Sequence, residues 1–409
     1  MATTFQGSST FIKALPIMAS AFIALAIGGV IGVSYIATLS GHPARGPFEG
    51  MTRLYGSHWY LMLLGFTNAL ISAELLTLLS MEWSRRVAPR HIIVVYLALY
   101  WLGVVTYMMG VYRVALVLAS GSMLVVAYHT WRTLLSRSWI GLPPTHYNYL
   151  LTLTPIISAI LILYWLASPL LGAPRYMLSI AMLILPVAAI LAVESRDIPL
   201  LLGIPPGKSL ALRSRGLRAR ATIAYATAVI GILLASAGYN MAGGVLIVIS
   251  GVMGAASVSL ISAIEAGSKA IPLAVRRHVG AHTALSFSWL ILAGVLAVLA
   301  DAGMLELNLR DALTHLLTLG FMFNVIMGID AILLYGHAGI SLSETPPPQP
   351  YPGILLNIGI ALRLLYDMGI LTMYSGVFSG LLTGIAILIF YIRNLRNIRR
   401  ILKRKAAGA

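Results

Sequence analysis

The chain contains no cysteine and few charged residues. Without a thiol it can form no disulfide, iron–sulfur cluster or blue-copper centre, and it has no thiolate nucleophile. Any metal ion must therefore be bound by histidine, aspartate, glutamate, tyrosine or methionine. Charged side chains make up only 10% of the 409 residues, whereas soluble domains carry roughly 25%. With a hydrophobic content of 59%, this scarcity excludes a water-soluble enzyme and a disordered chain.

In place of charge the chain has long apolar runs, and its mean hydropathy is +0.90. A helix needs about 20 apolar residues to cross the core of a bilayer. The runs are continuous and do not alternate, which favours helices over the strands of a membrane barrel. We therefore expect an all-α fold, a polytopic transmembrane helix bundle. The twelve expected spans are residues 13–39, 57–81, 92–110, 112–134, 149–168, 175–194, 219–238, 242–264, 281–300, 312–335, 353–372 and 374–392.

The longest connection between spans follows the sixth of them, contains several prolines and basic residues, and divides the chain six plus six. This spacing predicts a first six-helix half at 1–198 and a basic cytoplasmic linker at 199–218. A second six-helix half is expected at 219–396, followed by a basic cytoplasmic tail at 397–409.

Basic residues outnumber acidic ones, with 28 Lys and Arg against 12 Asp and Glu and a formal net charge of +16. In a soluble protein this excess would suggest nucleic acid as a partner. Here the cations lie between apolar spans and report orientation in the membrane, so we expect no nucleic-acid partner. With spans alternating in direction, 22 basic residues fall on one face of the membrane and 5 on the other. The richer face should be cytoplasmic, with both termini inside, in an integral multi-pass protein of the plasma membrane.

Ionisable residues are rare inside the expected spans, and such residues usually mark a site because they are costly in a bilayer. Glu74 lies in the second span and Asp330 in the tenth. Either carboxylate could supply protons to a reaction, which makes them the candidate catalytic residues. Arg363 and Asp367 are four residues apart in the eleventh span, on one helical face, and predict an intramembrane ion pair. That pair could lock helix packing or belong to a functional site.

Five histidines lie at the ends of spans. His58 and His315 are both just inside the outer ends of their spans and could clamp the edge of a haem. His278, His282 and His337 lie at the inner side and could hold a copper-like ion or a second haem. Neutral imidazole suits both metals. Taken one at a time, such histidines can also be interfacial side chains with no ligand.

Three segments around these histidines have the character of motifs. The second span reads His58-Trp-Tyr-Leu-Met-Leu-Leu-Gly-Phe, and the ninth opens His278-Val-Gly-Ala. The tenth runs from His315-Leu-Leu-Thr-Leu-Gly to Gly-His337-Ala-Gly, with 22 residues between the two histidines. These segments and the number of spans resemble the NnrS family of polytopic membrane proteins.

Members of that family bind haem and copper and are associated with nitric oxide metabolism. The resemblance implies that His58, His278, His315 and His337 bind a cofactor, b-type haem. The inner group His278, His282 and His337 stays the candidate copper site from its position, and His282 is an addition to the family's motif. The resemblance also implies that the chain handles nitric oxide or another small gas, by binding or as a haem-dependent oxidoreductase. Its other expected partners are the lipid bilayer and an electron donor.

Two other functions remain open at this point. A remote haem–copper oxidase or nitric oxide reductase-like catalytic subunit would also have about twelve spans, but such subunits usually carry an adjacent His-His pair and this sequence has none. A twelve-span secondary transporter would suit the six-plus-six division and the charges of Arg363 and Asp367. No convincing internal repeat supports it. A structural subunit is a third possibility, in which the basic tail would serve as a docking contact or as a contact with anionic lipid.

Overall fold

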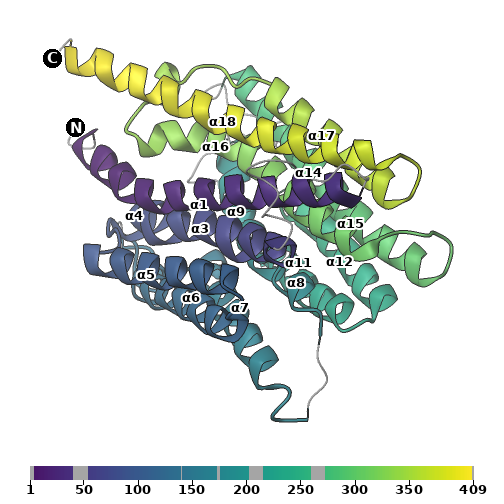
Figure 1. Cartoon of the computed structure of the whole chain (residues 1–409). Helices are drawn as coiled ribbons and strands as arrows, with labels where there is room; N and C mark the ends of the chain where they lie inside the picture. Colours follow the sequence, from purple (N-terminus) through teal and green to yellow (C-terminus); the bar gives the residue numbers. More distant parts are fainter. Residues whose placement is uncertain are drawn as a thin grey trace.

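The computed structural model describes residues 4–39, 54–139, 141–172, 176–201, 215–258 and 272–407. Within these ranges the chain is helical and contains no β-strand, which confirms the all-α class (Figure 1). The first half of the chain contributes α1 (Thr4–Leu39), α2 (His58–Tyr60), η2 (Leu61–Thr67), α3 (Asn68–Ala73), η3 (Glu74–Leu78), α4 (Leu79–Ser84), α5 (Arg90–Met108), α6 (Tyr112–Leu134), α7 (His146–Ala167), α8 (Leu178–Ala181) and α9 (Ile184–Leu201). The second half contributes α11 (Arg215–Ser236), α12 (Asn240–Ser257), α14 (Leu273–Asp301), α15 (Leu309–His315), η5 (Leu316–Met322), α16 (Phe323–His337), η6 (Leu342–Glu344), α17 (Tyr351–Asp367) and α18 (Met373–Ala407).

Ten helices in the described part of the chain are long and apolar enough to cross a membrane, so the protein is an integral multi-pass membrane protein. The other two predicted spans are also helical but shorter. One is the apolar segment Leu178–Glu194 and the other is the 17-residue helix α17. The first is interrupted between α8 and α9, because Pro186 has no N–H to donate to the Met182 carbonyl. The Leu185 amide donates to that carbonyl instead, at 3.2 Å.

Two helices lie in the interior of the bundle. We call them the His58 helix (Leu54–Ser84, from the turn before α2 to the end of α4) and the His315 helix (Leu309–His337, α15 to α16). In each, 89% of the most apolar stretch is buried inside the protein, against 33–56% for the other eight candidate spans. Side chains of these two helices therefore meet protein instead of lipid, and this is where polar groups can form a site.

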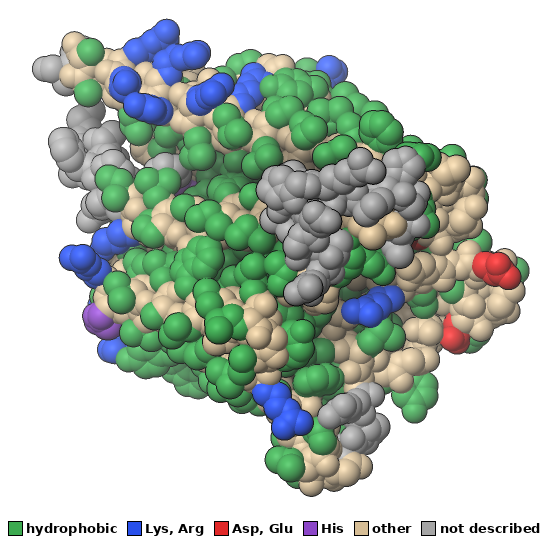
Figure 2. All heavy atoms as spheres, viewed as in Figure 1, with side chains coloured by type: hydrophobic (Ala, Val, Ile, Leu, Met, Phe, Trp, Pro, Cys, Tyr) green, Lys and Arg blue, Asp and Glu red, His purple; other side chains and the backbone are tan. Residues whose placement is uncertain are grey.

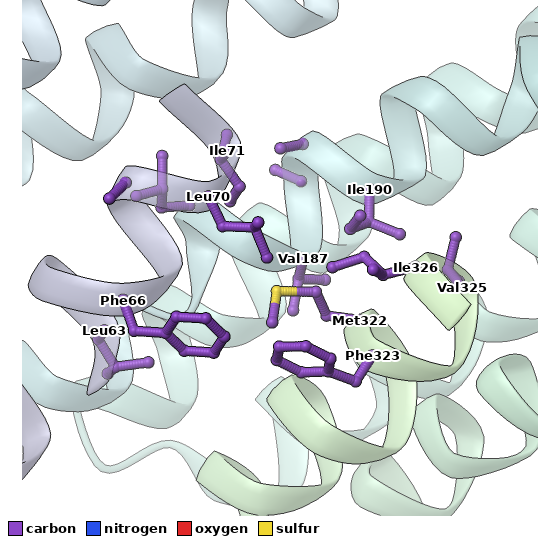
Figure 3. Packing of buried hydrophobic residues seen from close by; sticks show 14 of the residues in the cluster. Leu63, Phe66, Leu70, Ile71, Val187, Ile190, Met322, Phe323, Val325 and Ile326 are labelled. Atoms are coloured by element: carbon purple, nitrogen blue, oxygen red, sulfur yellow. The ribbon is translucent and has the colours of Figure 1, made fainter. Parts of the chain in front are cut away.

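The core lies where these two helices meet α9. Figure 3 shows Phe66 of the His58 helix facing Phe323 of the His315 helix, with Val187 of α9 beside them. The two rings stack with centroids 5.4 Å apart and planes 13° apart. This contact holds the two interior helices together midway along their length, with polar groups on either side of it.

The start of α1 and the end of α18 lie at the same end of the bundle (Figure 1), and α1 packs along α18. On the face shown in Figure 2, basic side chains gather at this end, whereas acidic side chains lie at the opposite end. α18 does not stop at the edge of its apolar span but continues as one helix through the basic residues to Ala407.

Candidate functional site

His58 begins the first helical turn of its interior helix and faces glycines of α1. Its Nδ1 lies 2.8 Å from the carbonyl oxygen of Gly28. A carbonyl only accepts, so Nδ1 carries the proton and Nε2 keeps its lone pair. The ring fits against α1 because Gly32 has no side chain: a Cβ there would lie 2.6 Å from the His58 Cε1 atom. α1 therefore holds the imidazole in one tautomer and one orientation.

His315 has the same tautomer but a different partner. Its Nδ1 donates to the backbone carbonyl of Asp311, one turn earlier in its own helix, at 2.9 Å. The Asp311 carboxylate lies 3.4 Å from the same nitrogen. Nε2 again keeps its lone pair. Metal-binding histidines typically donate their other ring N–H to a carbonyl or carboxylate in this way, and His58 and His315 share this arrangement.

A cluster of charges surrounds His315. Two nitrogens of Arg363 contact the same Asp311 oxygen, Nη2 at 2.5 Å and Nε at 2.6 Å. Asp367, the expected partner of Arg363, is further away at 3.6 Å. His58 also lies close enough to interact electrostatically with His315, Arg363 and Asp311. The two predicted haem ligands and the predicted ion pair therefore belong to one site.

The carboxylates of this cluster could also act as ligands. Among the described residues, Asp311, His315 and Asp367 each offer one ligand atom within 4.8 Å of the others. The Arg363 guanidinium already neutralises Asp311, so a cation at this set would compete with it. The cluster is therefore better suited to holding the His315 imidazole than to binding a free cation.

Each of these histidines precedes a widened stretch of helix. Residues Leu61–Thr67 and Leu316–Met322 form π-helical turns directly after α2 and α15. A third π-helical stretch, Glu74–Leu78, begins at the candidate catalytic residue Glu74. Such stretches are rare and frequently occur at functional sites, because they displace side chains from the regular helical positions.

His278 and His282 form a second histidine pair on α14. Their ring centroids are 4.5 Å apart. His278 Nε2 donates to the Met327 carbonyl at 3.1 Å, and His282 Nδ1 donates to Asn324 Oδ1 at 3.2 Å. These bonds leave lone pairs on His278 Nδ1 and His282 Nε2. Gly353 lies close to His282 Nε2, since a Cβ on Gly353 would be 2.7 Å from that atom.

A network of amides fixes the orientation of His282. Asn324 and Asn357 bond to each other in both directions, at 2.9 and 3.2 Å. Each also donates to a backbone carbonyl, Asn324 to Gly320 and Asn357 to Gly353, both at 2.7 Å. Trp289 Nε1 donates to Asn357 Oδ1 at 2.7 Å. Because the carbonyls determine which amide atom is nitrogen, Asn324 must present its oxygen to His282, and the network is fully satisfied.

His337 lies in a separate polar cluster. Its Nε2 is 2.7 Å from Glu82 Oε1, and its Nδ1 is buried with no hydrogen-bond partner among the described residues. Both candidate catalytic carboxylates, Glu74 and Asp330, lie close enough to His337 to interact with it electrostatically. The Tyr391 hydroxyl donates to Asp330 at 3.2 Å. Glu74, Asp330 and His337 thus share one cluster in the bundle interior.

The predicted copper ligands His278, His282 and His337 do not form one group in this structure. His278 bonds to Met327, and His337 lies ten residues further along the same helix, about 15 Å away at 1.5 Å per residue. Within the part of the chain that the structure describes, the ring nitrogens of these three histidines do not lie close enough together to bind one ion. The first two form a pair, and the third pairs with Glu82.

The sequence analysis missed three residues that complete these arrangements: Asp311, Glu82 and Asn357. Asp311 lies one turn before His315, and this i, i+4 spacing could have indicated it. Asn357 is an amide inside an apolar span, where polar side chains form hydrogen bonds between helices. No signal along the chain links Glu82 to His337, because they are 255 residues apart and only the packing of the two interior helices brings them together.

No curated protein sequence matches the chain. The family model described as NnrS protein matches residues 17–400, nearly the full length, including every histidine in the clusters above. The chain therefore belongs to the NnrS family, whose members are associated with haem, metals and nitric oxide.

Proposed function

We propose that the protein binds b-type haem between His58 and His315 and handles nitric oxide at that site, by binding it or by redox turnover. The observation that carries this proposal is the shared tautomer of the two histidines. Each donates Nδ1–H to a backbone carbonyl and keeps the Nε2 lone pair that iron would require. Family membership, which links the chain to nitric oxide, supports the same conclusion.

Other features of the site fit this group. Gly32 of α1 leaves room for the His58 ring, the Gly28 carbonyl accepts its proton, and Asp311 and Arg363 balance charge beside His315. Haem held by these residues would supply an iron that could bind a diatomic gas or pass electrons. A small apolar gas can reach this region from the lipid.

The inner clusters are proposed to serve this site. Glu74 and Asp330 place carboxyl groups beside His337 in the bundle interior, where they could relay protons. His278 Nδ1 and His282 Nε2 are the lone pairs that a copper ion would use, whereas His337 lies too far along the helix to bind the same ion. An electron donor and the orientation with both termini in the cytoplasm are part of the same proposal.

The test is the absorption spectrum of the purified protein. We expect a Soret band that shifts on reduction with dithionite and again on addition of nitric oxide. His58→Ala and His315→Ala should each lose most of the bound haem. His129→Ala is the matched control, because His129 is buried in α6 outside these clusters, and it should keep its haem. A colourless wild-type protein without iron, or full haem retention in both ligand variants, would contradict the proposal.

A further inference from the structure

One face of α18 is exposed along its whole length. Its exposed large hydrophobic residues are 39–59% accessible and recur at steps of four and three residues, as they do on a single helical face. At 100° per residue they lie within ~40° of one line along the helix. They are Tyr374, Phe378, Leu381, Ile385, Leu388 and Ile392. In a membrane-spanning helix this stripe faces the lipid chains.

The stripe continues beyond Ile392, where its residues change from apolar to basic. Continuing at steps of four, three and four residues, the same face carries Arg396, Arg399 and Lys403, all exposed. These three also lie within ~40° of the line of the apolar stripe. The cations therefore point outward over the surrounding lipid and not back over the protein.

Packing fixes this orientation of the helix extension. Ile398, on the other side of the helix, is 2% exposed, and Leu395 and Leu402 pack against the same core. Beyond them, Lys405 forms an ion pair with Glu344 at 2.9 Å. Hydrogen bonds from Ser341 and Lys405 hold the pKa of Glu344 at about 2, so this carboxylate stays ionised and occupies Lys405.

The cations of the stripe have no such partner. Among the residues that the structure describes, none of Arg396, Arg399 and Lys403 forms an ion pair with an acidic side chain. Figure 2 shows basic side chains gathered at this end of α18 with no acidic side chain beside them on the visible face. Along the axis, Arg396 and Arg399 lie about 6 and 10 Å beyond Ile392. The headgroup layer is about 5–7 Å thick on each side, so Arg396 lies at headgroup depth and Arg399 just beyond it, within reach of its long side chain.

We infer that Arg396, Arg399 and Lys403 form a binding site for the phosphate headgroups of anionic phospholipids, whose acyl chains lie along the apolar stripe of α18. This inference is independent of the proposed haem function. Guanidinium groups suit phosphate because they donate two parallel hydrogen bonds. Clusters of basic residues directly beyond a membrane span attract anionic lipids in the same way. The site would bind a lipid from the leaflet at the C-terminal end of α18.

The test uses the full-length protein reconstituted in bilayers of phosphatidylcholine with spin-labelled phosphatidylglycerol. Electron paramagnetic resonance gives the association constant of the anionic lipid relative to labelled phosphatidylcholine. We expect the wild type to prefer phosphatidylglycerol, and to lose this preference at high salt. R396Q/R399Q should lower the relative association constant at least fivefold, since one cation near an anionic surface contributes roughly that factor.

R400Q/R404Q is the matched control, because it removes the same charge from the same helix extension but off the line of the stripe. It should change the preference less than R396Q/R399Q does. Equal losses in the two double variants would show a general charge effect and overturn the assignment. So would a wild type without preference, or displacement of the lipid by inorganic phosphate at constant ionic strength, which would indicate a site for free anions.

Discussion

The two interior helices repeat one order of chemical groups. Each has a histidine shortly before a π-helical stretch and a phenylalanine eight residues after that histidine, Phe66 in one and Phe323 in the other. A carboxylate follows 15 or 16 residues after the histidine, as Glu74 and Asp330. The phenylalanines stack, so the two helices are in register and present matching groups at each level.

The difference between them lies in what holds each histidine. His58 donates to Gly28 on another helix, whereas His315 donates to a carbonyl of its own helix, beside a charged cluster. The orientation of His58 therefore depends on how closely α1 packs, and that of His315 on its own helical turn and on Asp311. Different substitutions should therefore displace the two ligands of the proposed cofactor.

Removing a charge from the cluster beside His315 should have the largest effect on the free energy of unfolding. Asp311→Asn keeps the backbone carbonyl that orients His315 but removes the charge that Arg363 contacts. Arg363 is 12% exposed, and loss of a partner for a buried charge costs several kcal/mol. Because Asp367 can take over part of the interaction, we expect a loss of about 2–3 kcal/mol in the free energy of unfolding.

Titration of the purified protein with a denaturing detergent would measure this loss. Asp311→Asn/Arg363→Met is the control, since it removes both charges and should recover much of the stability. If Asp311→Asn alone changed the unfolding free energy by less than roughly 0.5 kcal/mol, the cluster would have no role in holding the His315 side.

His282 differs from both His58 and His315, because its Nδ1 donates to a side chain, that of Asn324. Asn357→Leu removes the amide that binds both Asn324 and Trp289. A buried polar group left without a partner costs about 1–3 kcal/mol, so we expect a loss of about 2 kcal/mol. A second tautomer of His282 should also become populated, because Asn324 then keeps only its bond to the Gly320 carbonyl.

NMR of the histidine ring nitrogens reports the tautomer separately from stability. Trp289→Phe is the milder comparison, because it removes one donor and leaves the paired amides intact. A single, unchanged His282 tautomer in Asn357→Leu would mean that the amide network does not orient the ring.

The sequence alone was sufficient for the fold class because the bilayer imposes it. Long apolar runs must be helices, and each of the twelve expected runs overlaps a helix or a helical pair. The lengths of the helices were harder to predict. Pro186 interrupts the sixth run, and α18 continues far beyond its apolar part because Ile398 and its neighbours pack against the core. Neither effect follows from hydropathy.

The candidate site was predictable in its residue types but not in its partners. An ionisable residue inside an apolar span indicates a candidate site. This criterion selected His315, Glu74 and Asp330. It does not tell which groups meet. The preference of Arg363 for Asp311 over Asp367 and the separation of His337 from His278 depend on rotations of whole helices, which no spacing along the chain specifies.

The smallest effect is expected on the His58 side, where the two helices approach through glycine. A Cβ at Gly32 would lie 2.6 Å from His58 Cε1 and 2.8 Å from Nδ1, whereas at Gly29 it would meet nothing within 4 Å. Both changes to alanine favour the helix by up to about 1 kcal/mol. At Gly32 the imidazole must tilt and give up its bond to Gly28, and overpacking costs about 1–3 kcal/mol, so the net loss should be about 1 kcal/mol.

The matched pair Gly32→Ala and Gly29→Ala isolates this contact, because both residues lie on α1 within one turn. Thermal unfolding should show Gly32→Ala less stable than wild type and Gly29→Ala as stable or more so. The Soret band should weaken in Gly32→Ala alone, since only His58 is displaced while His315 keeps its bond to its own helix. Identical spectra and stabilities for the two variants would mean that α1 does not orient His58, and the contrast between the two ligands would disappear.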